Sequence, residues 1–301
     1  MSAVTSTRVD SAADSAAPAP ARKLRQKIKP SRVILGIVGV VISLIWVFPV
    51  YWMVNSSLLP NVVLQNTTPT WLPFGGSWDN FAAVINGGTF FPALGMSLVI
   101  AIVTVVFCIV FAFLAALAIS RFKFRGRKSF VLAVLLIQML PAEGLFIAQY
   151  KLMGSLNLLN TVLGVSIIYI AAVVPFTIWM LRGFVAAVPV ELEEAAYLDG
   201  ASWWRMFRSV LFPLVMPGLV ATSVFSFITA WNEFIFAMTL LGGASDQYTV
   251  AIGLKQFFGE HTNEWGYVMA ASTIITIPVM IFFVLVQRKL SSGLVAGAVK
   301  G

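Results

Sequence analysis

The sequence is poor in the residues from which soluble enzymes build their sites. Only 11% of its 301 residues are charged, and it contains one cysteine and one histidine. Cys108 has no partner for an intramolecular disulfide, and the single His261 argues against a histidine-rich metal site. No G-x-x-x-x-G-K-[ST] phosphate-binding loop occurs, and no nucleophile–base pair is recognisable. We therefore predict no catalytic residue, no bound metal and no cofactor in this chain.

Apolar residues, by contrast, make up 59% of the chain, and its mean hydropathy is +0.91. These values exceed those of soluble domains and predict an all-α integral membrane protein surrounded by lipid. A helix of about 20 apolar residues crosses a bilayer. The segments that we expect to cross are 33–54, 93–120, 129–148, 161–181, 218–241 and 265–286.

The six predicted spans form one membrane domain, 33–286, in which 93–286 is the core. Before it, residues 1–32 are rich in Ala, Ser and Pro and then in basic residues, which predicts a disordered basic tail. After it, residues 287–301 are predicted to be a flexible tail. Between the third and fourth spans, 149–160 is expected to be a short polar link.

Lysine and arginine are unevenly distributed among the segments between the spans. On the side of the N-terminal tail they number 7 in residues 1–32, 5 in 121–128, 3 in 182–217 and 3 after residue 286, which makes 18. The opposite side has Lys151 and Lys255, so the two groups account for all 20. The positive-inside rule then predicts that both termini are cytoplasmic. This topology explains the net charge of +8 without a nucleic-acid partner.

One long polar segment, 189–217, interrupts the apolar runs and predicts two short helices joined by a glycine. Pro189 suits the start of a helix, and the glutamates that follow it suit a helix N-terminus. Gly200 can adopt a positive φ to end this helix, and Ser202 can cap the next one. Arg205 and Arg208 should lie near the end of the second helix, where Pro213 and Pro217 stop or kink it. The segment is typical of a docking element between spans.

This segment also resembles the EAA loop of the membrane (permease) subunits of ABC importers. The family pattern is Glu-Ala-Ala, three residues, Gly, nine residues, then Ile-x-Leu-Pro, and its spacing is matched throughout. The matching residues are Glu194, Ala195, Ala196, Gly200, Val210, Phe212 and Pro213. Val210 and Phe212 replace one apolar residue with another. The alternative is an ordinary amphipathic cytoplasmic loop.

Two acidic residues fall inside predicted spans, Glu143 in the third and Glu233 in the fifth. A carboxylate at mid-bilayer is unfavourable by roughly 2.5–3.5 kcal/mol, so each should face protein or water. Trp231, Asn232 and Glu233 together offer an aromatic face and hydrogen-bonding groups, which suit a sugar. Gln138 is a weaker candidate of the same kind. The alternative for Glu233 is a structural bond to a neighbouring helix.

Further segments are similar to the carbohydrate-uptake branch of the same permeases, so the resemblance covers about residues 33–301. They are PTWLPFGGSWDNF, SLVIA, WNEF and GLVAGAVKG. Met96 departs from the Asn that family members often have before the SL pair. Proline also interrupts two spans, at Pro141 and Pro175, and is expected to kink them.

The resemblance implies a type I ABC importer permease fold in a bacterial plasma membrane. It implies a heterodimer with a sister permease, two cytoplasmic ATPase subunits that bind ATP and Mg²⁺, and an external solute-binding protein that delivers a carbohydrate. The role of coupling to the ATPases would fall to Glu194, Ala195, Ala196 and Gly200.

Two other functions remain compatible with the residues. The same machine could carry another polar solute, such as a glycerol-phosphate ester. A chain of a different class would be an autonomous secondary transporter that uses Glu143 or Glu233 as a proton relay. An inverted repeat or a second set of six spans would favour that class, and the sequence has neither. A membrane-embedded enzyme would need a nucleophile or a metal set, which the sequence does not offer.

Overall fold

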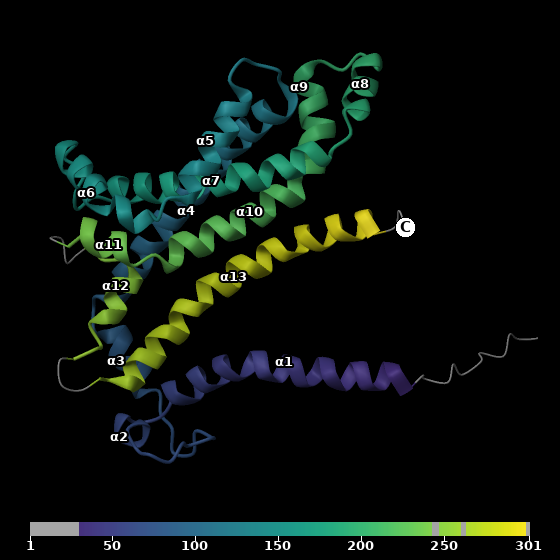
Figure 1. Cartoon of the computed structure of the whole chain (residues 1–301). Helices are drawn as coiled ribbons and strands as arrows, with labels where there is room; N and C mark the ends of the chain where they lie inside the picture. The colour runs from purple at the N-terminus through teal and green to yellow at the C-terminus, as the bar shows by residue number, and fades with distance from the viewer. Residues whose placement is uncertain (1–29, 243–246, 260–262, 299–301) are drawn as a thin grey trace, which may run out of the picture. The chain divides into compact units, whose positions relative to one another are not determined.

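The computed structural model describes residues 30–242, 247–259 and 263–298, which form helices joined by loops, with one isolated bridge between Phe258 and Asn263 (Figure 1). The helices are α1 (Pro30–Ser57), α2 (Asn61–Leu64), α3 (Asp79–Asn86), α4 (Phe90–Arg121), α5 (Arg127–Met139), η1 (Ala142–Leu145), α6 (Phe146–Ser155), α7 (Val162–Ala187), α8 (Val190–Leu198), α9 (Trp203–Met206), η2 (Phe207–Leu211), α10 (Phe212–Asn232), α11 (Ile235–Leu240), α12 (Val250–Lys255) and α13 (Trp265–Ala298). Residues 1–49 and 50–301 form two separate units, each described by itself. Of the predicted tail over 1–32, residues 1–29 lie outside the described residues, as does His261, whereas residues 30–32 are not disordered but begin α1.

Five helical stretches in the described residues are long and apolar enough to cross a membrane. They are Val33–Ser57, Phe90–Arg121, Val162–Ala187, Trp203–Asn232 and Trp265–Gln287. Each overlaps one predicted span, so helices are confirmed for the first, second, fourth, fifth and sixth. Residues 33–50 of α1 are apolar and exposed, which suits a helix covered by lipid or by another chain.

The predicted third span, 129–148, is not a single helix. α5 ends at Met139, and its 13 residues reach about 20 Å, which is less than the roughly 30 Å of a bilayer core. Pro141 cannot donate a backbone hydrogen bond, and the chain continues through the 3-10 turn η1 into α6. The prediction of a polar link over 149–160 was therefore wrong, because its first half is helical.

Pro213 and Pro217 were predicted to stop or kink the second helix, and the stop does not occur. α9 continues through a π-helical turn, η2, directly into α10, so the helical path is unbroken from Trp203 to Asn232. Proline lacks an N–H and crowds the carbonyl four residues earlier, which for Pro213 belongs to Ser209. Ser209 lies inside the wider π-helical turn, which accommodates that change of hydrogen-bond register.

Two other predicted boundaries differ from the structure. The fifth span was expected to reach Leu241, but α10 ends at Asn232 and the short helix α11 follows Glu233 and Phe234. The C-terminal segment was expected to be a flexible tail, but α13 runs on as a helix to Ala298. Both errors arise because apolar composition does not show where a helix breaks or continues.

Small side chains bring α4 against α7. Fully buried small residues recur on one face of α4 at intervals of three or four, at Ala101, Thr104, Cys108, Ala112 and Ala116. In lipid, helices gain little from burying large apolar side chains, so close packing of small residues drives their association. Consistent with this, the Cys108 thiol lies 3.3 Å from Thr177 Oγ1 on α7.

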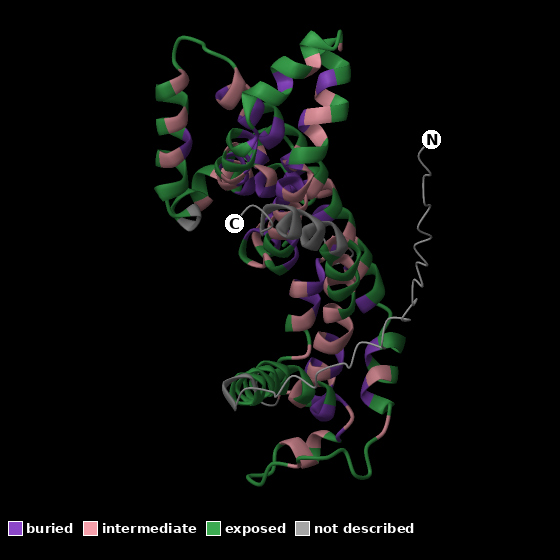
Figure 2. Ribbon diagram, turned by 90° about the vertical axis from the view of Figure 1, so that its right-hand side faces the viewer, coloured by how far each residue is buried: buried purple, intermediate pink, exposed green. Residues whose placement is uncertain are grey.

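The bundle has two apolar cores, one at each end of α4, α7 and α10. The first core joins the start of α4, the start of α7 and the end of α10 to α11, α12 and α13, and Phe227, Trp231 and Phe236 belong to it. The second joins the other halves of α4, α7 and α10 to α5, α9 and η2, and includes Phe113, Met206 and Leu211. Figure 2 shows the buried positions gathered where these helices pack together.

Candidate functional site

The predicted docking element is folded as two short helices that meet at a glycine. Gly200 follows α8 with φ +78°, and its N–H donates to the Tyr197 carbonyl over 3.0 Å. The Ala201 N–H donates to the Ala196 carbonyl, also over 3.0 Å. These two bonds form a Schellman motif, in which a residue with a positive φ ends the helix. The prediction that Gly200 ends the first helix is confirmed.

Ser202 begins the second helix. Its backbone is extended, and its Oγ accepts the Arg205 N–H at 3.4 Å, as expected of an N-cap. Behind it, Trp203 and Phe207 stack with ring centroids 5.4 Å apart, and Phe207 packs near Phe113 of α4. The turn between α8 and α9 therefore has a defined geometry and is packed onto the membrane helices.

An ion pair anchors α8 to the end of α4. Arg121 Nε lies 2.6 Å from Glu193 Oε1, and the side chains are only 12% and 10% exposed. The same guanidinium donates to the Val188 carbonyl at 2.8 Å, just before α8 begins. Charge-assisted bonds of this kind are short and strong, and they fix both position and angle. The start of α8 is thus held to a membrane-spanning helix.

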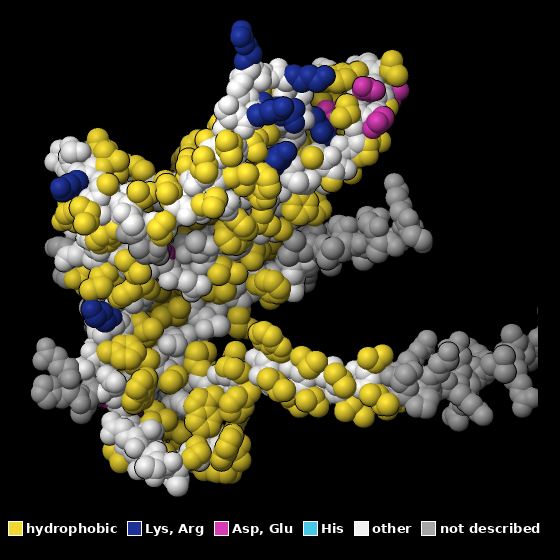
Figure 3. All heavy atoms as spheres, in the orientation of Figure 1, with side chains coloured by type: hydrophobic (Ala, Val, Ile, Leu, Met, Phe, Trp, Pro, Cys, Tyr) yellow, Lys and Arg dark blue, Asp and Glu magenta, His cyan; other side chains and the backbone are white. Residues whose placement is uncertain are grey.

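The outer surface of α8 and α9 remains exposed. Glu194 and Ala195 are exposed and Ala196 is half-buried. Beside them lie large apolar side chains without cover, with Leu198 90% exposed and Trp204 60% exposed. Figure 3 shows the acidic side chains of α8 next to basic residues that gather over the same end of the molecule. An apolar patch rimmed by charges is typical of a surface that binds another protein.

Glu233, predicted inside a span, lies in the break between α10 and α11. Its Oε1 accepts the Phe236 N–H at 2.8 Å and its Oε2 accepts the Ala237 N–H at 3.0 Å, so it caps α11. The Tyr169 hydroxyl on α7 donates to the same carboxylate. Every one of these bonds satisfies a group that would otherwise lack a partner away from water. In this structure the carboxylate therefore fills a structural role.

Among the described residues, none of the other predicted pathway residues is hydrogen-bonded to the Glu233 carboxylate. Trp231 is buried in the first core and stacked on Phe227, and its indole nitrogen has no hydrogen-bond partner among the described residues. Asn232 is exposed at the end of α10, and Gln138 is exposed near the end of α5. Glu143 belongs to the turn η1, but its side chain lies outside the described residues.

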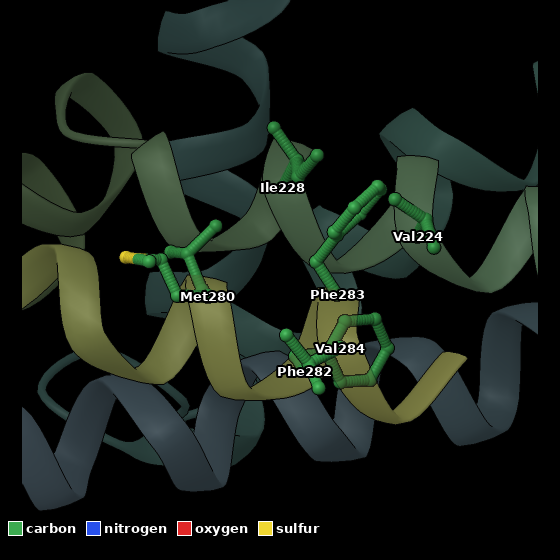
Figure 4. Close-up of a pocket in the computed structure, with 7 residues that line it drawn as sticks. Val224, Ile228, Met280, Phe282, Phe283 and Val284 are labelled. Atoms are coloured by element: carbon green, nitrogen blue, oxygen red, sulfur yellow. The ribbon is translucent and has the colours of Figure 1, made fainter. Parts of the chain in front are cut away.

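The groove between α10 and α13 does not resemble a sugar site. It encloses about 230 Å³ and is lined by apolar side chains alone (Figure 4). They are Val224, Ile228, Val279, Met280, Phe282, Phe283 and Val284. A sugar needs hydrogen-bonding partners for its hydroxyls, which this groove does not offer.

The sequence analysis missed the residues that hold α8 to α4 and those that hold the break before α11 to α7. Glu193 was treated as one of several glutamates at a helix start, and Arg121 as one charge among five in a loop. Tyr169 was not considered at all. Glu193 is the one buried residue of α8, so no pattern of buried positions along this helix could have singled it out, and its partner could not be identified without the fold.

The sequence of this chain matches a known protein family. Residues 108–295 match the model of the binding-protein-dependent transport system inner membrane component. The chain belongs to this family. The match includes the whole of α8, α9 and α10, and it carries the predicted EAA motif within it.

Relatives along nearly the whole chain agree. The chain is 40% identical over 270 residues to the diacetylchitobiose uptake system permease protein DasC of Streptomyces coelicolor, which covers 90% of this chain and 98% of that protein. It is 35% identical to the trehalose/maltose transport system permease protein MalG of Thermococcus litoralis, over 90% of this chain and 97% of the relative.

A solved structure shows the fold. A chain of a bacterial ABC transporter involved in the import of the acidic polysaccharide alginate superposes with a TM-score of 0.72 at 24% identity, over 86% of this chain and 98% of that one. The predicted type I ABC importer permease fold is confirmed, and the protein is an integral membrane subunit of that class.

We predict that Gly200→Ala destabilises the protein by about 1–2 kcal/mol, the penalty for a side chain in the left-handed region. A β-carbon at Gly200 would meet no atom within 4 Å, so backbone strain alone is tested. Gly183→Ala is the control, because that position in α7 is equally open and has no positive φ. Unfolding in detergent measures both variants, and equal stabilities would contradict the assigned turn.

We predict that Arg121→Met and Glu193→Gln each destabilise the protein by about 3 kcal/mol, because each leaves a largely buried group without its partner. The double variant should lose much less than the sum. Arg125→Met with Glu191→Gln is the control, since both residues are exposed, and its effects should add. An additive result for Arg121 and Glu193 would show that the pair does not hold α8.

We predict that Glu233→Gln lowers stability by about 1 kcal/mol, because the amide retains only one of two accepting oxygens at the start of α11. Asn232→Ala, at the neighbouring exposed position, should have little effect. Thermal unfolding measures both. Unchanged stability of Glu233→Gln together with a loss of uptake would instead support direct contact with the transported solute.

Proposed function

We propose that this protein is one of two membrane subunits of an ATP-driven importer for a sugar or oligosaccharide. It would form half of the translocation pathway with a sister permease, and an external solute-binding protein would deliver the substrate. Two ATPase subunits would bind ATP and Mg²⁺, and this chain would need no cofactor of its own. The observation that carries the proposal is the exposed surface of α8 and α9, held rigidly to α4.

The composition of that surface suits an ATPase groove. Leu198 and Trp204 supply apolar area, and Ala195 allows a second backbone to approach closely. Glu194 adds a negative charge at the rim, where it can pair with a basic residue of the partner. Because Gly200 and the Arg121–Glu193 pair fix the geometry, movement of the partner can be transmitted to the spans as a rigid body. The absence of a phosphate-binding loop in the sequence agrees with ATP hydrolysis in another subunit.

The substrate class rests on the relatives. One is named for diacetylchitobiose uptake and another for trehalose and maltose transport, and both align along about nine-tenths of this chain. They support a saccharide over a glycerol-phosphate ester.

The proposed topology places both termini and α8 on the cytoplasmic side of a bacterial plasma membrane. The chain must then cross once between the basic loop 121–128 and α7. We assign this crossing to α5, η1 and α6 together. Arg127 at the start of α5 lines the same cavity as Glu193 of α8, whereas Phe146 of α6 packs on Phe236 of α11 at the other end.

The rival proton-relay function finds less support. A relay carboxylate must exchange its proton with water or with another acid. Glu233 instead accepts bonds from two backbone amides and from Tyr169. The capping role explains why an acidic residue occurs between α10 and α11 without a proton relay.

The deciding experiment is purification of the tagged full chain from its native membranes in mild detergent. Recovery of a P-loop ATPase together with a second permease is the expected result, and the accompanying binding protein can then be screened against saccharides. Recovery of the chain alone, with solute movement in vesicles that lack ATP, would overturn the proposal.

We predict that Glu194→Lys reduces ATPase recovery in this purification roughly tenfold, which corresponds to about 1.4 kcal/mol of binding energy. Glu191→Lys is the matched control, because it makes the same charge change closer to the helix N-terminus, where the macrodipole effect is larger. If the loss came from the helix dipole alone, Glu191→Lys would lose at least as much. Normal recovery with Glu194→Lys would remove Glu194 from the interface.

A further inference from the structure

A second feature at this end of the molecule is a cavity of about 420 Å³ enclosed by the end of α4, the start of α5, α8 and α9. Among the residues that line it are three cations, Arg121, Lys123 and Arg127, and one acid, Glu193. Arg121 and Glu193 neutralise each other in the ion pair. Lys123 and Arg127 have no carboxylate within 4.0 Å in the described part of the chain. The cavity therefore carries two uncompensated positive charges.

The start of α5 adds to this positive potential. Arg127 and Lys128 occupy the first turn of the helix, where the macrodipole is positive and disfavours cations. Gly126 precedes them with φ +90° and has no side chain to cap the helix. An anion placed here would compensate both the side chains and the helix end. Nothing within the described residues supplies one.

We propose that this cavity binds the phosphate of an anionic phospholipid headgroup. The chemistry is that of a phosphate oxyanion, which a soluble phosphate could also supply. The surroundings favour the lipid, because Phe122, which lines the cavity, is 51% exposed and offers apolar surface for acyl chains. Basic pockets beside the cytoplasmic ends of spans are suited to such headgroups.

The site has a consequence for coupling, which rests on the proposed function. Glu193 and Tyr197 of α8 line the cavity together with Arg127 of α5. A headgroup bound there contacts the element that docks the ATPase and the loop that joins two spans. The anionic lipid thus acts as a third connection between α8 and the bundle, beside the ion pair and the apolar core.

The test measures lipid binding by the full chain in neutral detergent. Native mass spectrometry and thermal unfolding are recorded with dioleoyl phosphatidylglycerol, with dioleoyl phosphatidylcholine and with sodium phosphate. The site variant is Lys123→Gln/Arg127→Gln. The control is Arg125→Gln/Arg208→Gln, which removes two exposed charges from neighbouring segments outside the cavity lining.

Wild type should bind and be stabilised by phosphatidylglycerol and not by phosphatidylcholine. The site variant should bind phosphatidylglycerol roughly 30-fold more weakly, from the usual contribution of two cations near a membrane surface, and the control less than threefold more weakly. Equal losses in both variants would overturn the proposal, because they would show only general surface charge. Equal stabilisation by sodium phosphate would overturn the lipid assignment.

A third outcome would assign the cavity to the ATPase. If the site variant bound phosphatidylglycerol normally but lost ATPase recovery, an acidic segment of that partner would be the occupant, and the lipid proposal would fail. Because lipid binding is measured on the isolated chain, failure of the proposed transport function would leave this result unchanged.

Discussion

Inside a bilayer, a large apolar side chain gains almost nothing by leaving lipid for another helix, and this constraint shapes the whole bundle. α4 and α7 solve it with small residues, so that backbone approaches backbone and dispersion contacts replace the missing hydrophobic effect. α10 uses the same device at Gly218, where a β-carbon would lie 2.3 Å from the Phe184 ring. The three helices form a frame onto which the shorter segments at both ends are packed.

At the end that carries α8, the forces are different because water is present. There the Arg121–Glu193 pair, the Schellman turn at Gly200 and the Ser202 cap specify one orientation of the two short helices. Polar bonds are directional, whereas apolar contacts are not, so they define an angle that the apolar core alone would leave loose. The outward face of α8 and α9 is instead apolar, with Leu198 and Trp204 exposed. Rigidity inside and apolar exposure outside are what a docking element requires.

The sequence predicted most of the spans and the docking element, and the reasons for its failures are local. Hydropathy located the apolar runs but could not show that α5 stops at Met139 or that α10 stops at Asn232, since apolar residues continue beyond both breaks. Proline was misleading in one case and informative in another. The π-helical turn before Pro213 accommodates that proline within a continuous helical path. Pro141, by contrast, lies at the break between α5 and η1. The outcome depends on the neighbouring turn, which no spacing rule reveals.

The candidate site shows the same division between local and long-range information. Gly200 and Ser202 could be predicted because their roles depend on their own backbone and on residues at most four positions away. Arg121 lies 72 residues from Glu193, and Tyr169 lies 64 residues from Glu233, so neither partnership has a local signature. Glu194, the glutamate of the family pattern, is exposed, whereas the neighbouring Glu193 is buried.

The unbroken path from Trp203 to Asn232 gives these observations a common consequence. One end of this path is the second docking helix, and the other end is the break that Glu233 stabilises. A continuous helix transmits tilt along its length, so a displacement of α9 that the π-helical turn does not absorb moves Trp231 and Asn232 as well. The π-helical turn η2 lies near the docking end, and Phe207 within it is packed against α4. Under the proposed function, the π-helical turn is therefore the point at which this path can bend, close to the docking surface and far from Trp231 and Asn232.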